Sequence, residues 1–232
     1  MRPVGILGGM GPEATILLMQ KVLRAVEARD DADHLPLIVH QNPQVPSRIA
    51  ALIDGSGADP APVLAGMARD LARAGAEALA MPCNTAHHYA GAVREASDLP
   101  FLDMLALTTA ALSAKGVQRV GMLASPALRK VGVCAPYFES AGLLPIWGRD
   151  EDEMLAIIRA VKAGVEPGAL EARLNVLAAD VKRDGADHLL VACTELSLLT
   201  GGLGPREGWT DSLDCLVTGI VVFARGGEES PT

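Results

Sequence analysis

The feature that most constrains the fold of this chain is an internal repeat. Residues 70–85 read DLARAGAEALAMPCNT, and residues 180–195, which lie 110 positions later, read DVKRDGADHLLVACTE. The two stretches share an aspartate, an arginine, a Gly-Ala pair, an acidic residue, a leucine and a cysteine at equivalent positions. Residues 4–7, VGIL, similarly match residues 120–123, VGML, at a shift of 116. The chain is therefore predicted to contain two halves of similar structure.

Short apolar runs alternate with amphipathic stretches along both halves. Continuous apolar strands separated by helices indicate parallel β-sheets that are covered on both faces. We expect helices near residues 13–28, 60–74, 86–97, 104–115, 127–140, 152–163, 168–184 and 211–224. We expect strands near residues 3–8, 36–40, 77–81, 100–102, 118–123, 143–146 and 187–191. The predicted fold class is α/β, with two pseudo-symmetric domains of three layers and mainly parallel sheets.

Two of the four cysteines stand where an apolar strand of the repeat ends. Cys83 follows such a run in AMPCNTAHHY, and Cys193 follows one in LLVACTELSL. Ligands of parallel sheets bind at the carboxyl ends of strands. Two similar halves that face each other would bring both thiols to one cleft, where we expect the active site. A lone buried cysteine is usually a small apolar core residue, and this interpretation is kept for Cys134 and Cys215, which lack the duplicated setting.

A matched pair of thiols suits the inversion of a stereocentre. One thiolate can remove a proton from one face of a carbon atom while the opposite thiol delivers a proton to the other face. The unperturbed thiol pKa of about 8.5 makes both protonation states accessible near neutral pH. Asn84, Thr85 and Thr194 add N–H groups and small polar side chains that could bind a substrate carboxylate. Thiols also act as nucleophiles, metal ligands and redox partners, but the pseudo-symmetry favours acid–base chemistry.

Composition and charge argue against several classes of partner. The net charge is -8 and Lys and Arg form no cluster, so nucleic acid is not an expected partner. No stretch approaches the ~18 uninterrupted apolar residues of a membrane helix, and the N-terminal residues lack the pattern of a signal peptide. The four cysteines show no CxxC or zinc spacing. We therefore expect reduced thiols, no metal and a cytoplasmic location.

Four segments carry a resemblance to a known family. They are residues 8–15 (GGMGPEAT), 42–44 (NPQ), 82–87 (PCNTAH) and 193–195 (CTE). In this order, and over nearly the whole chain, they resemble the aspartate/glutamate racemase superfamily, most closely its aspartate racemase branch. The resemblance implies a two-base amino acid racemase that needs no cofactor, pyridoxal phosphate included, and that forms a homodimer. It also implies a first domain of residues 1–103 plus 211–232, to which the C-terminal helix returns, and a second domain of residues 104–210.

The resemblance also assigns roles to single residues. Cys83 and Cys193 become the two acid–base residues, and Arg48 becomes the arginine that binds a substrate carboxylate. Lys162 becomes a second cation that receives a substrate carboxylate. The residues that it places along the substrate site are Met10, Gln41, Asn84, Thr85 and Thr194. The chain departs from its relatives at Ser125-Pro126, where many carry a loop with threonine and glycine. The sequence therefore does not predict which side chain the preferred substrate carries.

Two further residues have open roles. His87 lies four residues after Cys83, on the same face of the helix that begins there, and it either supports the site or caps the helix. Glu195 either orients the Cys193 side of the site or is an acidic residue in the first turn of a helix. A carboxylate directly against a thiol would raise the pKa of the thiol, so Glu195 is not expected to be a base.

Several functions remain possible at this stage. The first is racemisation of aspartate or glutamate, with a broader range of amino acids left open. The second is another reaction on the same scaffold, such as isomerisation or decarboxylation of a dicarboxylate. The third is a non-catalytic dicarboxylate-binding protein, which the presence of both thiols disfavours. Dinucleotide binding by residues 9–14, GMGPEA, is also disfavoured, because the next strand ends in His40-Gln41-Asn42 rather than in an acidic residue for the ribose.

Overall fold

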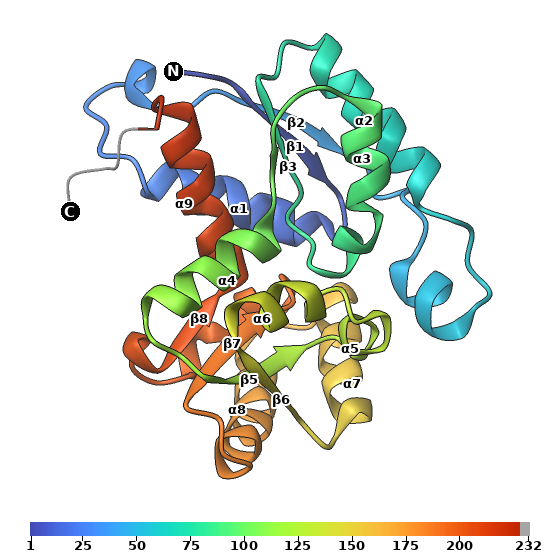
Figure 1. Ribbon diagram of the computed structural model, residues 1–232, viewed down its shortest axis with the longest axis vertical. Coiled ribbons are helices and arrows are strands. Elements are labelled where there is room, and N and C mark those ends of the chain that lie inside the picture. Colours follow the sequence, from blue (N-terminus) through green and yellow to red (C-terminus); the bar gives the residue numbers. More distant parts are fainter. Residues whose placement is uncertain (228–232) are drawn as a thin grey trace. The chain divides into compact units, whose positions relative to one another are not determined.

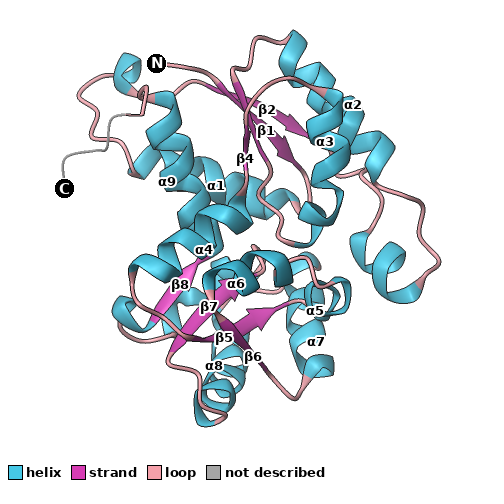
Figure 2. Ribbon diagram, viewed as in Figure 1, coloured by secondary structure: helices cyan, strands magenta, loops and turns pink. Residues whose placement is uncertain are grey.

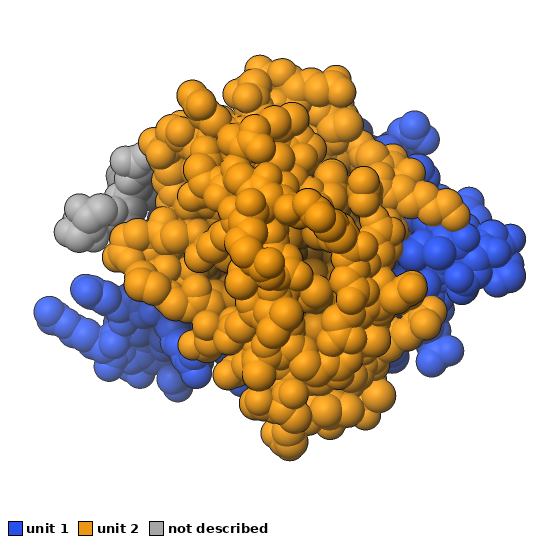
Figure 3. Space-filling model, turned by 90° about the horizontal axis from the view of Figure 1, so that it is seen from below, with its two compact units in different colours: residues 1–104, 213–232 blue, residues 105–212 orange. Residues whose placement is uncertain are grey.

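The computed structural model describes residues 1–227 and has two four-stranded parallel sheets with helices between the strands (Figures 1 and 2). The chain divides into two compact units, with residues 1–104 and 213–232 in unit 1 and residues 105–212 in unit 2 (Figure 3). Residues 228–232 lie outside the described part. The α/β class and the parallel sheets predicted from the sequence are confirmed. The folding domains expected from the resemblance stay a prediction.

Unit 1 contains the first sheet. Its strands β1 (Val4–Gly8), β2 (Leu37–Gln41), β3 (Ala78–Ala80) and β4 (Phe101–Leu102) have the spatial order β2-β1-β3-β4. The helices α2 (Ala61–Arg73) and α3 (Ala90–Ala96) lie on one side of this sheet, and α1 (Pro12–Arg24) and α9 (Ser212–Ala224) lie on the other (Figure 1). An ion pair between Lys21 and Asp214 joins α1 to α9. The sheet of unit 1 is therefore the middle of three layers.

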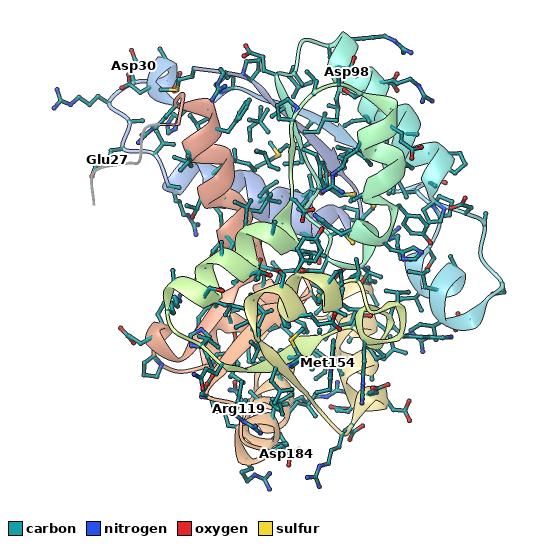
Figure 4. All side chains as sticks on the ribbon, viewed as in Figure 1. Glu27, Asp30, Asp98, Arg119, Met154 and Asp184 are labelled. Carbon is teal, nitrogen blue, oxygen red and sulfur yellow. The ribbon has the colours of Figure 1, made fainter. Side chains whose placement is uncertain are left out.

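Unit 2 repeats this arrangement with β5 (Arg119–Ala124), β6 (Leu144–Trp147), β7 (His188–Ala192) and β8 (Trp209–Asp211), in the order β6-β5-β7-β8. Alternate strand residues enter two different cores. Leu123 and Val191 pack with α7 (Glu151–Lys162) and α8 (Gly168–Arg183), in a core that includes Met154 (Figure 4). Met122 and Leu190 pack with α4 (Met104–Ala114), α5 (Pro126–Val131) and α6 (Ala135–Ala141). A sheet buried on both faces explains the continuous apolar strands of the sequence.

The internal repeat also appears in the register of the strands. Gly5 of β1 and Gly121 of β5 pair with leucines at equivalent places in β3 and β7. A Cβ atom on Gly5 would lie 2.9 Å from the Cβ of Ala76, and a Cβ atom on Gly121 would lie 2.9 Å from the Cβ of Ala186. These two alanines belong to the Gly-Ala turns of the repeat. Glycine in the central strand thus lets the turn after the covering helix approach the sheet closely.

Three predicted helices differ in the structure, and one strand was not predicted. The first helix ends at Arg24, earlier than residue 28. The helix expected at 127–140 is two helices, α5 and α6, because Gly132 adopts a left-handed φ of 64° that ends α5. The helix expected at 86–97 begins as a 3₁₀ helix, η3 (Thr85–Tyr89), before α3. The strand β8 was not expected, because its sequence, WTD, has no apolar run and adjoins the helix expected from residue 211.

Further short helices complete the described chain. They are η1 (Asp31–Asp33), the π-helical η2 (Ala50–Asp54), η4 (Leu196–Gly202) and η5 (Arg206–Gly208). Every helix within residues 1–227 is too short or too polar to cross a bilayer.

Candidate active site

Cys83 lies three residues beyond β3, at the carboxyl edge of the first sheet. The residue is 8% exposed and belongs to the same apolar cluster as Met10 and Met81. Its N–H donates to the carbonyl oxygen of Met81 at 2.9 Å, which fixes a tight turn between the strand and η3. Asn84 and Thr85, both buried, follow it directly. The sequence motif PCNT is therefore a strand-to-helix turn that holds a thiol at the edge of the sheet.

The loop after β1 reaches the same edge. The N–H of Gly9 donates to Oγ1 of Thr15 at 2.9 Å, and Gly9 has a φ of 94°. A Cβ atom on Gly9 would lie only 2.4 Å from the carbonyl carbon of Asn42, so this position requires glycine. The loop places Met10 in the cluster that contains Cys83. Gln41, the last residue of β2, is exposed and pairs with Gly8 at this edge.

His87 ties the Cys83 turn to the start of α4. Its Nδ1 lies 2.9 Å from the carbonyl oxygen of Cys83, and its Nε2 lies 3.2 Å from the N–H of Met104. A backbone N–H can only donate, so Nε2 accepts from Met104. Nδ1 therefore carries the ring proton and donates a hydrogen bond to the carbonyl oxygen of Cys83. Burial lowers the pKa of His87, and the Asp103 carboxylate, which lies 3.9 Å from Nε2, opposes this effect. His87 is therefore a neutral ring that fixes the backbone around the thiol.

Arg48 lies in the helical turn that leads directly into η2 and is partly buried. Its Nη1 donates to the carbonyl oxygens of Val45 at 3.2 Å and Pro46 at 2.9 Å. Its Nε is buried and has no hydrogen-bond partner within residues 1–227. The pKa of Tyr89 is raised by burial and by the Asp59 carboxylate, and the Arg48 guanidinium opposes this effect. The guanidinium thus retains a buried donor that the described residues do not use.

Cys193 occupies the equivalent place in unit 2, directly after β7. It is 7% exposed, and its Sγ donates to Oε2 of Glu195 at 3.1 Å. The other carboxylate oxygen of Glu195 forms an ion pair with Nζ of Lys162, at the end of α7. Thiol, carboxylate and ammonium therefore form one chain of contacts. Lys162, which was expected to receive a substrate carboxylate, is engaged by a carboxylate of the protein itself.

Thr194 and Ser197 complete this edge of the second sheet. Oγ1 of Thr194 is buried and has no hydrogen-bond partner among the residues that the structure describes. Ser197 donates to Oδ1 of Asp211 at 2.9 Å, which joins η4 to the end of β8. Ser125 caps α5 by accepting from the N–H of Ala127 at 3.2 Å. The Ser125-Pro126 segment is thus the capped start of a short helix rather than an open loop.

The structure therefore gathers the expected residues into two groups. In unit 1, Met10, Cys83, Asn84 and Thr85 are buried at one sheet edge, with Gln41 exposed at that edge. In unit 2, Cys193, Thr194, Glu195 and Lys162 adjoin one another at the equivalent edge. Sequence reasoning missed Tyr89, Asp103 and Asp211, because their roles arise from contacts between segments. No cluster of three or more His, Cys, Asp or Glu suited to a metal ion occurs within residues 1–227.

Comparisons with known proteins place this arrangement in a family. The family model for Asp/Glu/hydantoin racemases matches residues 7–218. The broad-specificity amino-acid racemase RacX of Bacillus subtilis is 24% identical over 94% of this chain and 96% of its own length. The solved structure of Picrophilus torridus aspartate racemase is 26% identical, with a TM-score of 0.87 over 97% of this chain and 95% of that chain.

A second solved structure extends the likeness in fold. An aspartate racemase homologue from Pyrococcus horikoshii is 22% identical, with a TM-score of 0.75 over 97% of this chain and all of that chain. The family model covers more than half of the chain and spans both strand-end cysteines. The chain therefore belongs to the Asp/Glu/hydantoin racemase family.

Proposed function

We propose that this protein is an amino acid racemase that interconverts L- and D-aspartate or glutamate without a cofactor, with Cys83 and Cys193 as its two acid–base residues. The observation that carries the proposal is the duplicated strand-end cysteine, buried at the carboxyl edge of each sheet and followed by small polar residues. The similarity to an aspartate racemase and to a broad-specificity racemase supports the reaction class.

The proposed reaction moves one proton in each direction. With L-aspartate, the Cys193 thiolate removes the α-proton and the bond between Cα and hydrogen breaks, which leaves a carbanion stabilised through the α-carboxylate. The Cys83 thiol then donates its proton to the opposite face and a new bond to hydrogen forms. Cys193 ends as the thiol and Cys83 as the thiolate, so the reverse reaction starts from D-aspartate at Cys83.

Glu195 and Lys162 have a supporting role in this proposal. The Cys193 thiol must be deprotonated before it can act as the base, and its hydrogen bond to the Glu195 carboxylate favours the protonated form. Lys162 neutralises the carboxylate, so that its negative charge does not hold the proton on sulfur. We therefore assign Lys162 to the control of Cys193, in place of the direct binding of substrate expected from the resemblance.

Two buried donors without partners within residues 1–227 support binding of an anionic amino acid. Nε of Arg48 lies in unit 1 and Oγ1 of Thr194 lies in unit 2. An unpaired buried donor costs free energy unless a ligand satisfies it. A carboxylate is the ligand that suits a guanidinium best. Arg48 is accordingly the proposed receptor of the substrate's side-chain carboxylate, and Met10, Gln41, Asn84 and Thr85 are proposed to line the same site.

A broader substrate range is the second candidate. Because Lys162 is engaged by Glu195, Arg48 is the one cation proposed for the side chain of the substrate. One cation discriminates less strongly against neutral side chains than two would. The similarity to a racemase named for broad specificity fits this arrangement. Decarboxylation of a dicarboxylate needs one thiol to protonate the product carbon, so this reaction would give the second cysteine no chemical role.

The setting of the enzyme is part of the proposal. We expect a homodimer in the cytoplasm, because the family resemblance suggests the assembly and because four reduced cysteines suit a reducing compartment. The substrate is a small molecule, and neither nucleic acid nor a membrane is an expected partner.

Incubation with single enantiomers of aspartate and glutamate in D2O, with no cofactor added, tests the proposal. Product formed early from L-aspartate should carry deuterium at Cα, because the donor thiol has exchanged with solvent, while unreacted L-aspartate stays mostly protium. Cys83→Ala should abolish racemisation in both directions and still permit slow exchange into L-aspartate. Cys193→Ala should show the mirror result with D-aspartate.

The outcomes separate the alternatives. Racemisation at near wild-type rate in either cysteine variant would refute the two-base pair. Exchange into the opposite enantiomers would reverse the assignment of each thiol to a face. Faster racemisation of neutral amino acids than of aspartate would favour the broad-specificity candidate.

A further inference from the structure

One face of α1 carries exposed apolar side chains that the fold does not use. Ile16, Met19 and Leu23 are 48%, 42% and 53% exposed, and their i, i+3, i+7 spacing places them on one side of the helix. The described chain exposes four other large hydrophobic residues, which share no helix face. These four are Met1, Leu144, Val165 and Val176. The three residues of α1 therefore form a stripe rather than scattered exposure.

Packing within unit 1 does not explain this stripe. The opposite face of α1 already buries Ala14, Thr15, Leu18 and Val22. α9 lies alongside α1 (Figure 1). Asp214 of α9 forms an ion pair with Lys21 of α1. A surface helix normally presents polar residues to solvent, and an apolar stripe with a polar edge marks an interaction site. The stripe is therefore interpreted as a surface that binds a partner outside this chain.

The charges beside the stripe favour a second copy of the same chain. Glu13 and Arg24, both exposed, lie near the two ends of α1. They are eleven residues apart, which is about three turns, so they stand on the same side of the stripe. When two α1 helices pack antiparallel about a two-fold axis near Met19, Glu13 of each copy lies opposite Arg24 of the other. Ile16 then lies opposite Leu23, so the pattern is self-complementary.

We propose that α1 is the surface through which two copies of this chain associate, with Ile16, Met19 and Leu23 at the centre and Glu13 and Arg24 at the rim. An apolar centre with a charged rim is the usual anatomy of such an interface. The stripe is smaller than the roughly 800 Å² per partner of a standard interface, so the dimer should dissociate on dilution. The inference rests on the proposed homodimer and not on the proposed racemase activity.

Light scattering and sedimentation, from low micromolar to near-millimolar protein and with no substrate present, test this surface. The wild type should shift from monomer to dimer as its concentration rises. Leu23→Glu should weaken the dimer by at least about tenfold, because it buries a charge at the centre. Val176→Glu, which changes a residue 61% exposed on α8, is the matched control and should dimerise like the wild type. Circular dichroism checks that each variant is folded.

A charge swap tests the antiparallel geometry. Glu13→Arg alone and Arg24→Glu alone should each weaken the dimer several-fold, since like charges then face each other at both ends. The double variant restores opposite charges across the interface and should recover most of the lost affinity. A wild type that stays monomeric, a Leu23→Glu dimer as tight as the wild type, or a double variant no tighter than the single ones would overturn the proposal. Because no reaction is measured, failure here is distinct from failure of the racemase assay.

Discussion

At the residue scale, the two proposed acid–base thiols have different surroundings. Cys193 donates to a carboxylate that Lys162 neutralises. Cys83 instead has the neutral ring of His87 bound to its carbonyl oxygen. A carboxylate beside a sulfur disfavours the thiolate through charge repulsion, and a cation beside that carboxylate offsets the repulsion. The thiolate population of Cys193 should therefore depend on both Glu195 and Lys162.

We predict opposite effects for Glu195→Gln and Lys162→Met on the reactivity of Cys193. At neutral pH, loss of the carboxylate charge should speed its alkylation by iodoacetamide and loss of the ammonium should slow it. Each change should be about tenfold for a shift of one unit in the thiol pKa. Mass spectrometry of the Cys193 peptide against pH gives the rates. Arg159→Met, which removes another cation from the last turn of α7, is the control. Equal rates in all four proteins would contradict the dependence.

The second prediction at this scale concerns Arg48. Arg48→Met should raise KM for aspartate roughly ten- to hundredfold, because a lost charge-assisted hydrogen bond costs about 1.5–3 kcal/mol. KM for a neutral amino acid should change far less. Arg48→Lys keeps the charge and should recover part of the loss, and Arg69→Met, an exposed arginine of α2, should behave like the wild type. An unchanged KM for aspartate in folded Arg48→Met would remove Arg48 from the site.

At the element scale, both sheets depend on a glycine in the central strand. A Cβ atom on Gly121 would lie 2.7 Å from Cγ1 of Val181 in α8 and 2.9 Å from the Cβ of Ala186. These distances are shorter than packed carbon atoms tolerate, so the helix or the turn would have to move.

Gly121→Ala should therefore lower the free energy of unfolding by about 1–3 kcal/mol. Gly91→Ala is the matched control, because nothing lies within 4 Å of the added Cβ atom in α3. That substitution should be neutral or should stabilise by up to about 1 kcal/mol. Urea unfolding of both variants, followed by circular dichroism, gives the comparison. An unfolding midpoint in Gly121→Ala equal to that of the wild type would show that α8 can shift without loss of stability.

The same scale shows how far the sequence could predict this molecule. The repeat and the continuous apolar strands were enough to predict two parallel sheets, because strands buried on both faces leave an unmistakable composition. The break at Gly132 was missed, since glycine inside a helical pattern does not reveal whether its φ is left-handed. The strand β8 was missed because its three residues, WTD, include one apolar side chain and so lack the apolar run that marked the other strands.

The candidate site was predictable to a different depth. Strand-end positions place Cys83 and Cys193 by local sequence alone. The ion pair of Lys162 with Glu195 joins residues 33 positions apart and depends on how α7 packs against β7. The bond from Met104 to the ring of His87 likewise joins residues 17 apart. Contacts of this kind follow from tertiary packing. The sequence motifs therefore predict which residues belong to the site but not which residues they contact.

At the scale of the whole molecule, each unit buries one histidine at an edge of its sheet. The pKa of His87 is lowered by burial, against the pull of Asp103. The pKa of His188, whose Nε2 lies 2.9 Å from Oγ1 of Thr210, is lowered by burial and then by Lys115. The Asp187 carboxylate raises the pKa of His188, and Arg206 and Lys182 lower it. Cations and a carboxylate therefore act in opposite directions, and the pKa of His188 is lowered overall.

This direction predicts acid sensitivity. A histidine whose pKa is lower in the folded state than its unfolded value of about 6.5 binds fewer protons when folded. Its contribution to stability is fully present above pH 6.5 and is lost as the pH falls from there toward the folded pKa, at up to about 1.4 kcal/mol per pH unit for each histidine. The urea midpoint of the wild type should therefore be flat from pH 8 to 7 and fall between about pH 6.5 and 5.

His87→Asn and His188→Gln, which keep a polar group at the positions of Nδ1 and Nε2 respectively, should each make this fall less steep. His88→Gln, at an exposed position beside His87, should leave it unchanged. A pH profile of His87→Asn/His188→Gln as steep as that of the wild type would assign the acid sensitivity to other groups.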